Sequence, residues 1–377
     1  MQRLLTVIAG ASDRDLCPTR ARVPGLSRFT SVQLADESGA SVPAQIDGDS
    51  LAFVTTGLRR GETRQLRLTT DLAPAPREIG FGLMHRPGES LDFIVGGQIF
   101  TSYWFNSGLA RPFFHPVVGP GERRVARAFP MERIAGETSD HPHHRGLWVA
   151  HGEVNGVDCW SEVQGHGTIA HHDFESLASG PAFARAVERL EWRSADRRRV
   201  LAEQRTMTVH NLPSESRMLD LDVRLAASDG PVVLGDTKEA GLVSVRVATT
   251  MDGNTGGLIE NGAGGVREAA TWGREAPWCH YSGPVQGEAL GIGLIDHPSN
   301  PRYPTNWHVR DYGLMTANPF GLHDFFPDSG KDGSMRIEAG ETVTFRYRVF
   351  VHAGDASAGQ MDERHADFAA PPSVAVE

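Results

Sequence analysis

Leu219-Asp220-Leu221-Asp222-Val223-Arg224-Leu225 alternates apolar and polar side chains without interruption. Residues 342–349, Thr-Val-Thr-Phe-Arg-Tyr-Arg-Val, follow the same period of two. That period is typical of a β-strand with one buried face and one wet face. Residues 91–95 are more uniformly apolar, which indicates a strand buried on both faces. Residues 185–192 fit a strand or a helix, and we favour a strand because the later segments alternate.

Turn residues separate these strands. The chain has 42 glycines and 23 prolines in 377 residues, which favours many turns and disfavours long helices. Residues 31–34, 51–54 and 64–68 are short, mostly alternating segments and predict a small β-sandwich at the N-terminus. Two prolines within residues 71–76 indicate a linker. A short helix is expected over residues 357–368, ended by Ala370-Pro371-Pro372.

We therefore predict an all-β protein. Residues 76–356 are expected to form a large antiparallel β-sandwich of the galactose-mutarotase-like, or supersandwich, type that carries the site. Residues 1–75 are expected to form the small N-terminal β domain, and residues 357–377 a short helix and a tail. The concave face of such a sheet suits a sugar, because it combines hydrogen-bonding partners with apolar platforms.

Charge and composition narrow the partners. A formal net charge of −10 argues against a nucleic-acid or anionic-membrane partner. Three scattered cysteines predict neither a disulfide framework nor a zinc ribbon. No apolar run reaches the roughly 18 to 20 residues of a membrane helix. Residues 1–11 look more like a first β-strand than a secretion signal, so we expect a cytoplasmic protein. Both a monomer and a homo-oligomer fit the sequence.

The first group of chemically active residues is Asp140-His141-Pro142-His143-His144-Arg145. Pro142 excludes a helix interior, and in an extended segment His141 and His143 point to one face while His144 points to the other. Histidines titrate near neutrality and bind metals, so the cluster predicts a proton shuttle or a metal cage. The alternative is a set of histidines that bond to backbone carbonyls.

Two further segments are rich in polar side chains. Asp236-Thr237-Lys238-Glu239 offers a general acid–base pair, or else a polar turn with a surface ion pair. Residues 296–312 combine three prolines with His, Asn, Arg and aromatic side chains, as binding loops on a β scaffold do. Trp307 and Tyr312 are expected to stack on a pyranose ring, or else to be core aromatics. Asp-His-Pro occurs at 140–142 and again at 296–298, which suggests two loops that converge.

Two other histidine segments carry less weight. His166 lies between two glycines, which fits either a backbone approach to a ligand or an incidental turn. His171 and His172 are expected to be exposed at the end of a strand.

Together these segments resemble the PmoA-like family, a DUF6807-type group of bacterial proteins. The matching motifs lie at 140–148, 236–239, 296–302 and 307–313, and the resemblance covers about the last three quarters of the chain. Ala240 and Cys159 depart from it, where Gly and Phe are expected. A membrane methane oxygenase needs transmembrane helices, so the family's name does not describe this chain. The resemblance implies a role on sugars or oxidised sugars and supplies no catalytic residues.

Three classes of function follow. The first is an enzyme that cleaves or isomerises a glycoside or keto-sugar (a 3-keto-glycoside lyase or hydrolase, or an epimerase) by acid–base chemistry. Its candidate catalytic residues are His141, His143, His144, Lys238, Glu239 and His308. Its candidate substrate-binding residues are Asp140, Arg145, His151, Asp236, His297, Asn300, Arg302, Trp307, Arg310, Tyr312 and Asn318. The second is an oxygenase or other enzyme with a divalent metal on His141, His143 and Glu239. The third is a sugar-binding protein without catalysis.

Overall fold

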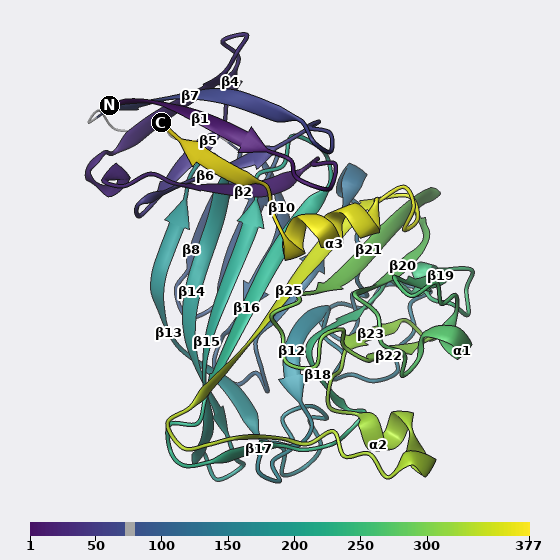
Figure 1. The fold of residues 1–377 in the computed structure, drawn as a ribbon. Coiled ribbons are helices and arrows are strands. Elements are labelled where there is room, and N and C mark those ends of the chain that lie inside the picture. Colours follow the sequence, from purple (N-terminus) through teal and green to yellow (C-terminus); the bar gives the residue numbers. More distant parts are fainter. Residues whose placement is uncertain (72–79) are drawn as a thin grey trace.

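The computed structural model describes residues 1–71 and 80–377. Most of the predicted linker therefore lies outside the described residues. The predicted N-terminal strands are confirmed and form two small sheets that pack on each other (Figure 1). The first sheet has the order β26 (Ser373–Val376), β1 (Gln2–Ile8), β7 (Thr63–Asp71), β3 (Ser31–Asp36) and β4 (Ser41–Val42). The second has the order β2 (Cys17–Arg22), β6 (Ser50–Thr55) and β5 (Ala44–Asp47).

Two eight-stranded antiparallel sheets form the large part of the molecule, which confirms the predicted sandwich. The first sheet has the order β22 (Trp307–Arg310), β23 (Leu314–Ala317), β18 (Ala240–Arg246), β12 (Leu147–His151), β11 (Phe113–Val117), β10 (Gln98–Trp104), β9 (Ser90–Val95) and β8 (Gly82–Arg86). The second has the order β13 (Thr168–Ser179), β14 (Phe183–Arg193), β15 (Arg199–His210), β16 (Arg217–Ala226), β25 (Thr342–Ala353), β21 (Glu288–Asp296), β20 (Trp278–Val285) and β19 (Leu258–Asn261).

Alternation along the strands builds the core between these sheets. In β16 the apolar residues Leu219, Leu221 and Val223 are fully buried, while Asp220 and Asp222 between them lie on the other face. Full burial of each such side chain contributes roughly 1.5–3 kcal/mol. Residues 91–95 are buried on both faces except for Ile94, and residues 185–192 belong to β14, as predicted.

The C-terminal segment differs from the prediction. The expected helix is α3 (Met361–Ala369), but the residues after it are not a tail: they form β26, which pairs with β1. The two small sheets together form what we call the N-terminal module. Figure 1 shows the two termini side by side in this module, above the ends of the long strands. The ion pair between Arg14 and Asp367 (3.0 Å) also joins α3 to this module.

The remaining elements are short. They are α1 (Glu268–Thr271), α2 (Leu322–Phe325), β17 (Val232–Leu234) and β24 (Met335–Ile337). The described residues also include 3-10 turns at Leu26–Arg28, Pro120–Glu122, Thr249–Met251 and Pro327–Ser329. Across the described part of the chain, helices fall short of the length and apolar character that crossing a membrane requires.

Candidate functional site

One end of the first large sheet carries a buried polar face. Residues paired across a sheet share a face, and one row crosses β12, β18, β23 and β22 through Trp148, Ser244, Thr316 and His308. These four side chains are at most 1% exposed. The next row carries Arg246 and Arg310, both paired with Leu314. The intervening residues Val243, Val245, Trp307 and Val309 point into the sandwich core.

The loop that carries Asp140 to Arg145 covers this face, and the backbone conformation of Gly146 and a hydrogen bond to β18 hold it there. Gly146, at its end, has a φ of 59°, and a Cβ atom there would collide with the carbonyl oxygen of Phe114. The amide of Arg246 donates to the Gly146 carbonyl at 2.9 Å, which joins the loop to β18. Only glycine fits such a position without strain.

The three histidines form one cluster. His141 has a φ of 44°, and the His144 amide donates to its carbonyl, so the segment turns here. The His144 ring centroid lies 4.8 Å from that of His141 and 4.4 Å from that of His143. Our prediction that His144 points away from the other two is therefore wrong, because it assumed an extended backbone.

Asp140 anchors the cluster to two buried guanidinium groups. Its Oδ1 accepts hydrogen bonds from Arg127 Nη1 at 2.5 Å and from Arg246 Nη2 at 2.8 Å. Both arginine side chains are at most 1% exposed, whereas that of Asp140 is 40% exposed. Burial alone would raise the pKa of Asp140, but Arg246, a hydrogen bond from His141 and Arg127 lower it to about 2. Asp140 is therefore ionised at neutral pH.

His141 is held by this carboxylate and remains accessible. Its Nδ1 lies 2.7 Å from Asp140 Oδ2, and its side chain is 40% exposed. The ring contacts those of both His144 and Tyr312 in near-parallel orientation, and the Tyr312 centroid is 5.0 Å away at an interplanar angle of 11°. An ionised carboxylate at Nδ1 selects the tautomer with the proton on that nitrogen, so Nε2 carries the lone pair.

The other histidines of the site are neutral at pH 7. Burial, and next Arg111, lower the pKa of His143 to about 4. Burial lowers the pKa of His144 far below its ordinary range, and burial with the charges of Arg310 and Lys238 lowers that of His308 to about 3. Neutral imidazoles serve as hydrogen-bond partners and not as fixed charges.

The loop before β18 brings a carboxyl group to the same site. Burial raises the pKa of Glu239, and the Lys238 ammonium lowers it in part. Burial raises the pKa of Tyr312 to about 12, with Arg310 opposing the shift and Glu239 adding to it. The Tyr312 ring in turn contacts that of His141. The site therefore combines a carboxyl group that burial favours in its protonated form with positive charges and a neutral phenol.

Asp236 and Asn318 hold this loop in place. Asp236 accepts hydrogen bonds from the amides of His323 and Gly333. Asn318 is fully buried and donates to the carbonyls of Thr237 and Lys238 at 3.1 Å. Their hydrogen-bonding atoms are used within the protein, so the structure places them as loop supports and not as the substrate contacts that we predicted.

The second Asp-His-Pro motif lies elsewhere. The His297 ring packs on Phe368 of α3, so the two motifs do not converge as we predicted. Asn300 bonds to Asp296 and to both backbone groups of Arg346. Arg302 donates to the carbonyls at 319, 333 and 334. These three predicted binding residues fix loops.

Trp307 and His151 belong to the core. Both are fully buried; the Trp307 indole N–H donates to the Ala276 carbonyl, and His151 packs on Phe320. Neither side chain reaches a ligand from this position. Of the two predicted stacking residues, only Tyr312 lies in the site.

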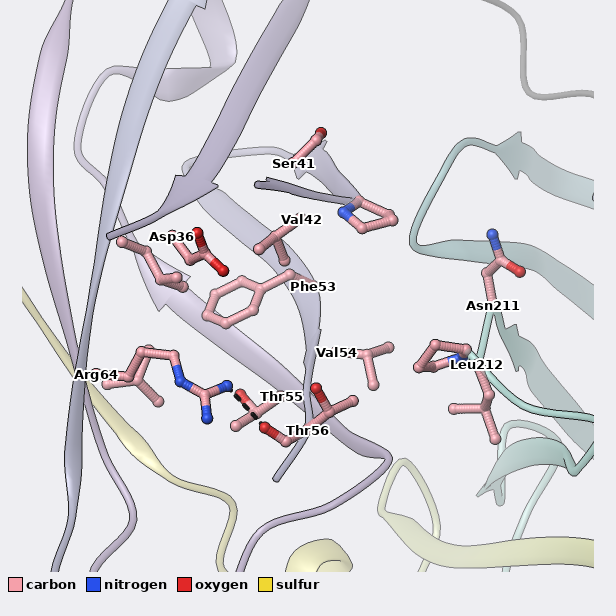
Figure 2. Close-up of a pocket in the computed structure, with 14 residues that line it drawn as sticks. Asp36, Ser41, Val42, Phe53, Val54, Thr55, Thr56, Arg64, Asn211 and Leu212 are labelled. Carbon is pink, nitrogen blue, oxygen red and sulfur yellow. Dashed lines mark hydrogen bonds between the residues drawn. The ribbon is translucent and has the colours of Figure 1, made fainter. Parts of the chain in front are cut away.

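Arg145 is bonded to a carboxylate at the wall of a neighbouring cavity. Its guanidinium binds Glu162 through Nε at 3.1 Å and Nη2 at 2.9 Å, and both residues line this cavity, whose volume is about 920 Å³. A separate cavity of about 340 Å³ lies between the N-terminal module and residues 211–213 (Figure 2). One of its polar side chains, Arg64, donates a hydrogen bond to the Thr56 carbonyl. Its lining includes no residue of the histidine cluster.

The metal set that we considered does not come together. Within residues 1–71 and 80–377, no group of three or more His, Cys, Asp or Glu side chains is arranged to hold a metal ion. His141 also uses Nδ1 for Asp140. His141, His143 and Glu239 are therefore not a ligand set in this structure.

Sequence reasoning missed the two arginines that anchor the site. Arg246 ends the alternating segment Leu242-Val243-Ser244-Val245-Arg246, so its place on a polar face is visible in the sequence. Arg127 has no such signal, because its partner Asp140 is in a loop and the contact depends on the tertiary fold.

A family model matches residues 90–366 of the chain, and its description is a family of unknown function (DUF6807). The chain belongs to this DUF6807 family. The DUF6807 part of the predicted resemblance is thereby confirmed, while the description carries neither an activity nor a PmoA-like link. No curated protein matches the chain.

Three solved structures are similar to this DUF6807 protein at low identity. An α-mannosidase from Enterococcus faecalis V583 has a TM-score of 0.45 at 10% identity, over all of this chain and 46% of its own. A glycosyl hydrolase family 38 protein from Enterococcus faecalis has a TM-score of 0.46 at 9% identity, over all of this chain and 47% of its own. An α-galactosidase from Lactobacillus brevis has a TM-score of 0.39 at 11% identity, over 77% of this chain and 42% of its own. The chain spans less than half the length of these proteins.

Proposed function

We propose that the DUF6807 protein is an enzyme that abstracts a proton beside the carbonyl group of a keto-sugar. The observation that carries this proposal is the pair of Asp140 and His141. An ionised carboxylate, fixed by two buried arginines, orients an accessible imidazole with its Nε2 lone pair available. A positioned histidine of this kind is the commonest general base in enzymes.

The proposed reaction is an elimination. His141 Nε2 removes the proton from the carbon next to the carbonyl, and the electron pair first forms an enolate with the carbonyl group. When the carbonyl re-forms, this pair makes a double bond to the next carbon. The bond between the next carbon and its glycosidic oxygen breaks. Glu239, whose pKa burial raises, gives its proton to the leaving oxygen. The products are an unsaturated keto-sugar and an alcohol, and solvent then returns the proton from His141 to Glu239.

The positive groups of the site support the charged intermediate. Arg310 and Lys238 are near Glu239, and both are partly exposed, so a ligand oxygen can approach them. Preorganised positive groups stabilise an enolate more than water does, since they need no reorganisation during the reaction. The Tyr312 ring contacts the His141 ring and the guanidiniums of Arg246 and Arg310, and so helps to position these groups.

The test is proton exchange in heavy water, followed by proton NMR with 3-keto-glycosides. We expect the signal of the proton beside the carbonyl to disappear and the alcohol to be released. His141→Gln is expected to slow both events by a factor of roughly 10² to 10⁴. His323→Gln, an exposed histidine on α2, is the matched control and should retain the wild-type rate.

Glu239→Gln separates the two steps. Exchange should continue, because the base is intact, while release of the alcohol slows. Unchanged exchange in His141→Gln, at wild-type folding stability, would refute the assignment of the base.

A further inference from the structure

A second cavity, lined by different residues from the histidine cluster, lies beside Arg145. Its volume is about 920 Å³, within the range of small-molecule sites. The loops at 105–112 and 162–166, the start of β13 and the turn between β14 and β15 form its walls. Its charged lining residues are Arg145, Arg193, Arg197 and Glu162. In a chain with a net charge of −10, this wall is locally positive.

The pairing of these charges sets the charge of the ligand. Arg145 binds Glu162 through two hydrogen bonds, and Arg193 binds Glu191 in the same way at 2.9 and 2.6 Å. Arg197 is exposed and makes no salt bridge with any residue that the structure describes. Glu162 is shared with buried Arg111 at 3.3 Å, so positive charges exceed negative ones here, and Arg197 is the lining guanidinium without a carboxylate partner among the described residues. An unpaired guanidinium matches a carboxylate, which it binds in bidentate geometry.

A histidine at the cavity wall is oriented from inside the protein. His171 Nδ1 lies 2.6 Å from Oε1 of Glu188, which is fully buried. Tyr103 donates to the other carboxyl oxygen of Glu188 at 2.6 Å. The rings of Phe105 and Phe174 hold that of His171, with centroids at 4.4 and 4.8 Å. This arrangement leaves Nε2 as the polar atom of the ring that a ligand in the cavity can use.

Glu188 is costly to bury. Arg205 donates to the Tyr103 hydroxyl at 3.0 Å and to Glu203 at 2.7 Å, so several polar groups lie between the sheets. Well-packed apolar side chains in such a place are often equally or more stabilising. Ligand binding by His171 would explain why Glu188 is buried, because the Glu188 carboxylate fixes the orientation of this imidazole at the cavity wall.

We propose that this cavity binds a small hydroxylated monocarboxylate, of the sugar-acid class. Arg197 pairs with the carboxylate, and His171 Nε2 accepts a hydrogen bond from a hydroxyl group of the ligand. The proposal does not depend on the reaction proposed for His141, because it rests on different residues.

The test is a calorimetric titration of the full chain with glucuronate and gluconate, and with glucose and sorbitol as their neutral counterparts. We expect the acids to bind at least tenfold more tightly than the neutral compounds, and to bind more weakly as salt rises. Arg197→Gln is expected to weaken binding of the acids at least tenfold. Arg198→Gln changes the adjacent exposed arginine, which does not line the cavity, and should have no effect.

Two other results would overturn the proposal. One is equal affinity of the acids for the Arg197→Gln and Arg198→Gln proteins. The other is an absence of any preference for acids over neutral sugars at millimolar concentrations. His141→Gln should retain the binding, and its loss in that variant would place the acid at the histidine cluster instead.

Discussion

Replacing Asp140 by Asn tests how the candidate site is held together. The change removes the negative charge on which two buried guanidiniums converge. The lowering of the pKa of Asp140 from 3.8 to about 2 corresponds to about 2 kcal/mol. Since the side chain is 40% exposed, solvent screening reduces this electrostatic part to about 1 kcal/mol. Loss of the partner of buried Arg127 and Arg246 acts in the same direction, so we expect a decrease of roughly 1–2 kcal/mol in the free energy of unfolding.

Urea denaturation at a series of pH values measures this difference. Because the folded pKa is lowered, the stabilisation by Asp140 is present above its ordinary pKa near 4 and is lost as the pH falls toward 2. The free energies of unfolding of the wild-type protein and of Asp140→Asn should therefore differ by the same amount at pH 7 and at pH 6. The difference should narrow below pH 4.

Asp173→Asn is the matched control. Asp173 is also 40% exposed and its pKa is also lowered to about 2, but its partner Arg189 is 52% exposed. If burial of the guanidinium partners matters, this variant should keep wild-type stability. An equal loss in both variants, or no loss in Asp140→Asn, would refute the reasoning.

Three further results are expected. Gly146→Ala should lower the free energy of unfolding in urea by several kcal/mol, because the added Cβ would collide with the Phe114 carbonyl. Gly156→Ala is the control: this glycine is also at positive φ but has open space around it, so the free energy of unfolding should fall by only about 1 kcal/mol. Burial lowers the pKa of His308 to about 3, so the unfolded chain binds a proton there that the folded chain does not. Stability should be fully present above pH 6.5 and fall as the pH drops from 6.5 toward 3, and His308→Gln should make this fall less steep in urea midpoints. Tyr103→Phe, which leaves two buried polar partners short of a hydrogen bond, should lower the free energy of unfolding by about 1–3 kcal/mol, measured in the same way.

The sequence was sufficient to predict the strands and the loops that carry the site. Alternation is a local property: side chains two positions apart share a face whatever the neighbouring strand is, so β16 and β25 were visible without a fold. Dense polar segments such as 140–145 and 236–239 were visible for a similar reason, since packing alone does not call for them.

The tertiary structure decided which groups become partners. Arg127 and Arg246 meet Asp140, and Glu188 meets His171, only because particular strands and loops lie side by side. Hydrogen bonds and ion pairs join residues that the strand order brings together, and a local pattern does not contain that order.

The structure likewise separated loops that look alike in sequence. The loops after Asp140 and Asp296 share Asp-His-Pro but have different neighbours, so one presents an accessible imidazole and the other packs on α3. Trp307 and His308 are neighbours on β22 and point to opposite faces of the sheet. Trp307 therefore lies in the core, and His308 lies on the polar face. The sequence by itself determined the strands and the polar loops of this protein, because each depends on neighbouring residues along the chain. The burial of each side chain and its bonding partners depend on packing between distant segments, and only the tertiary structure decided them.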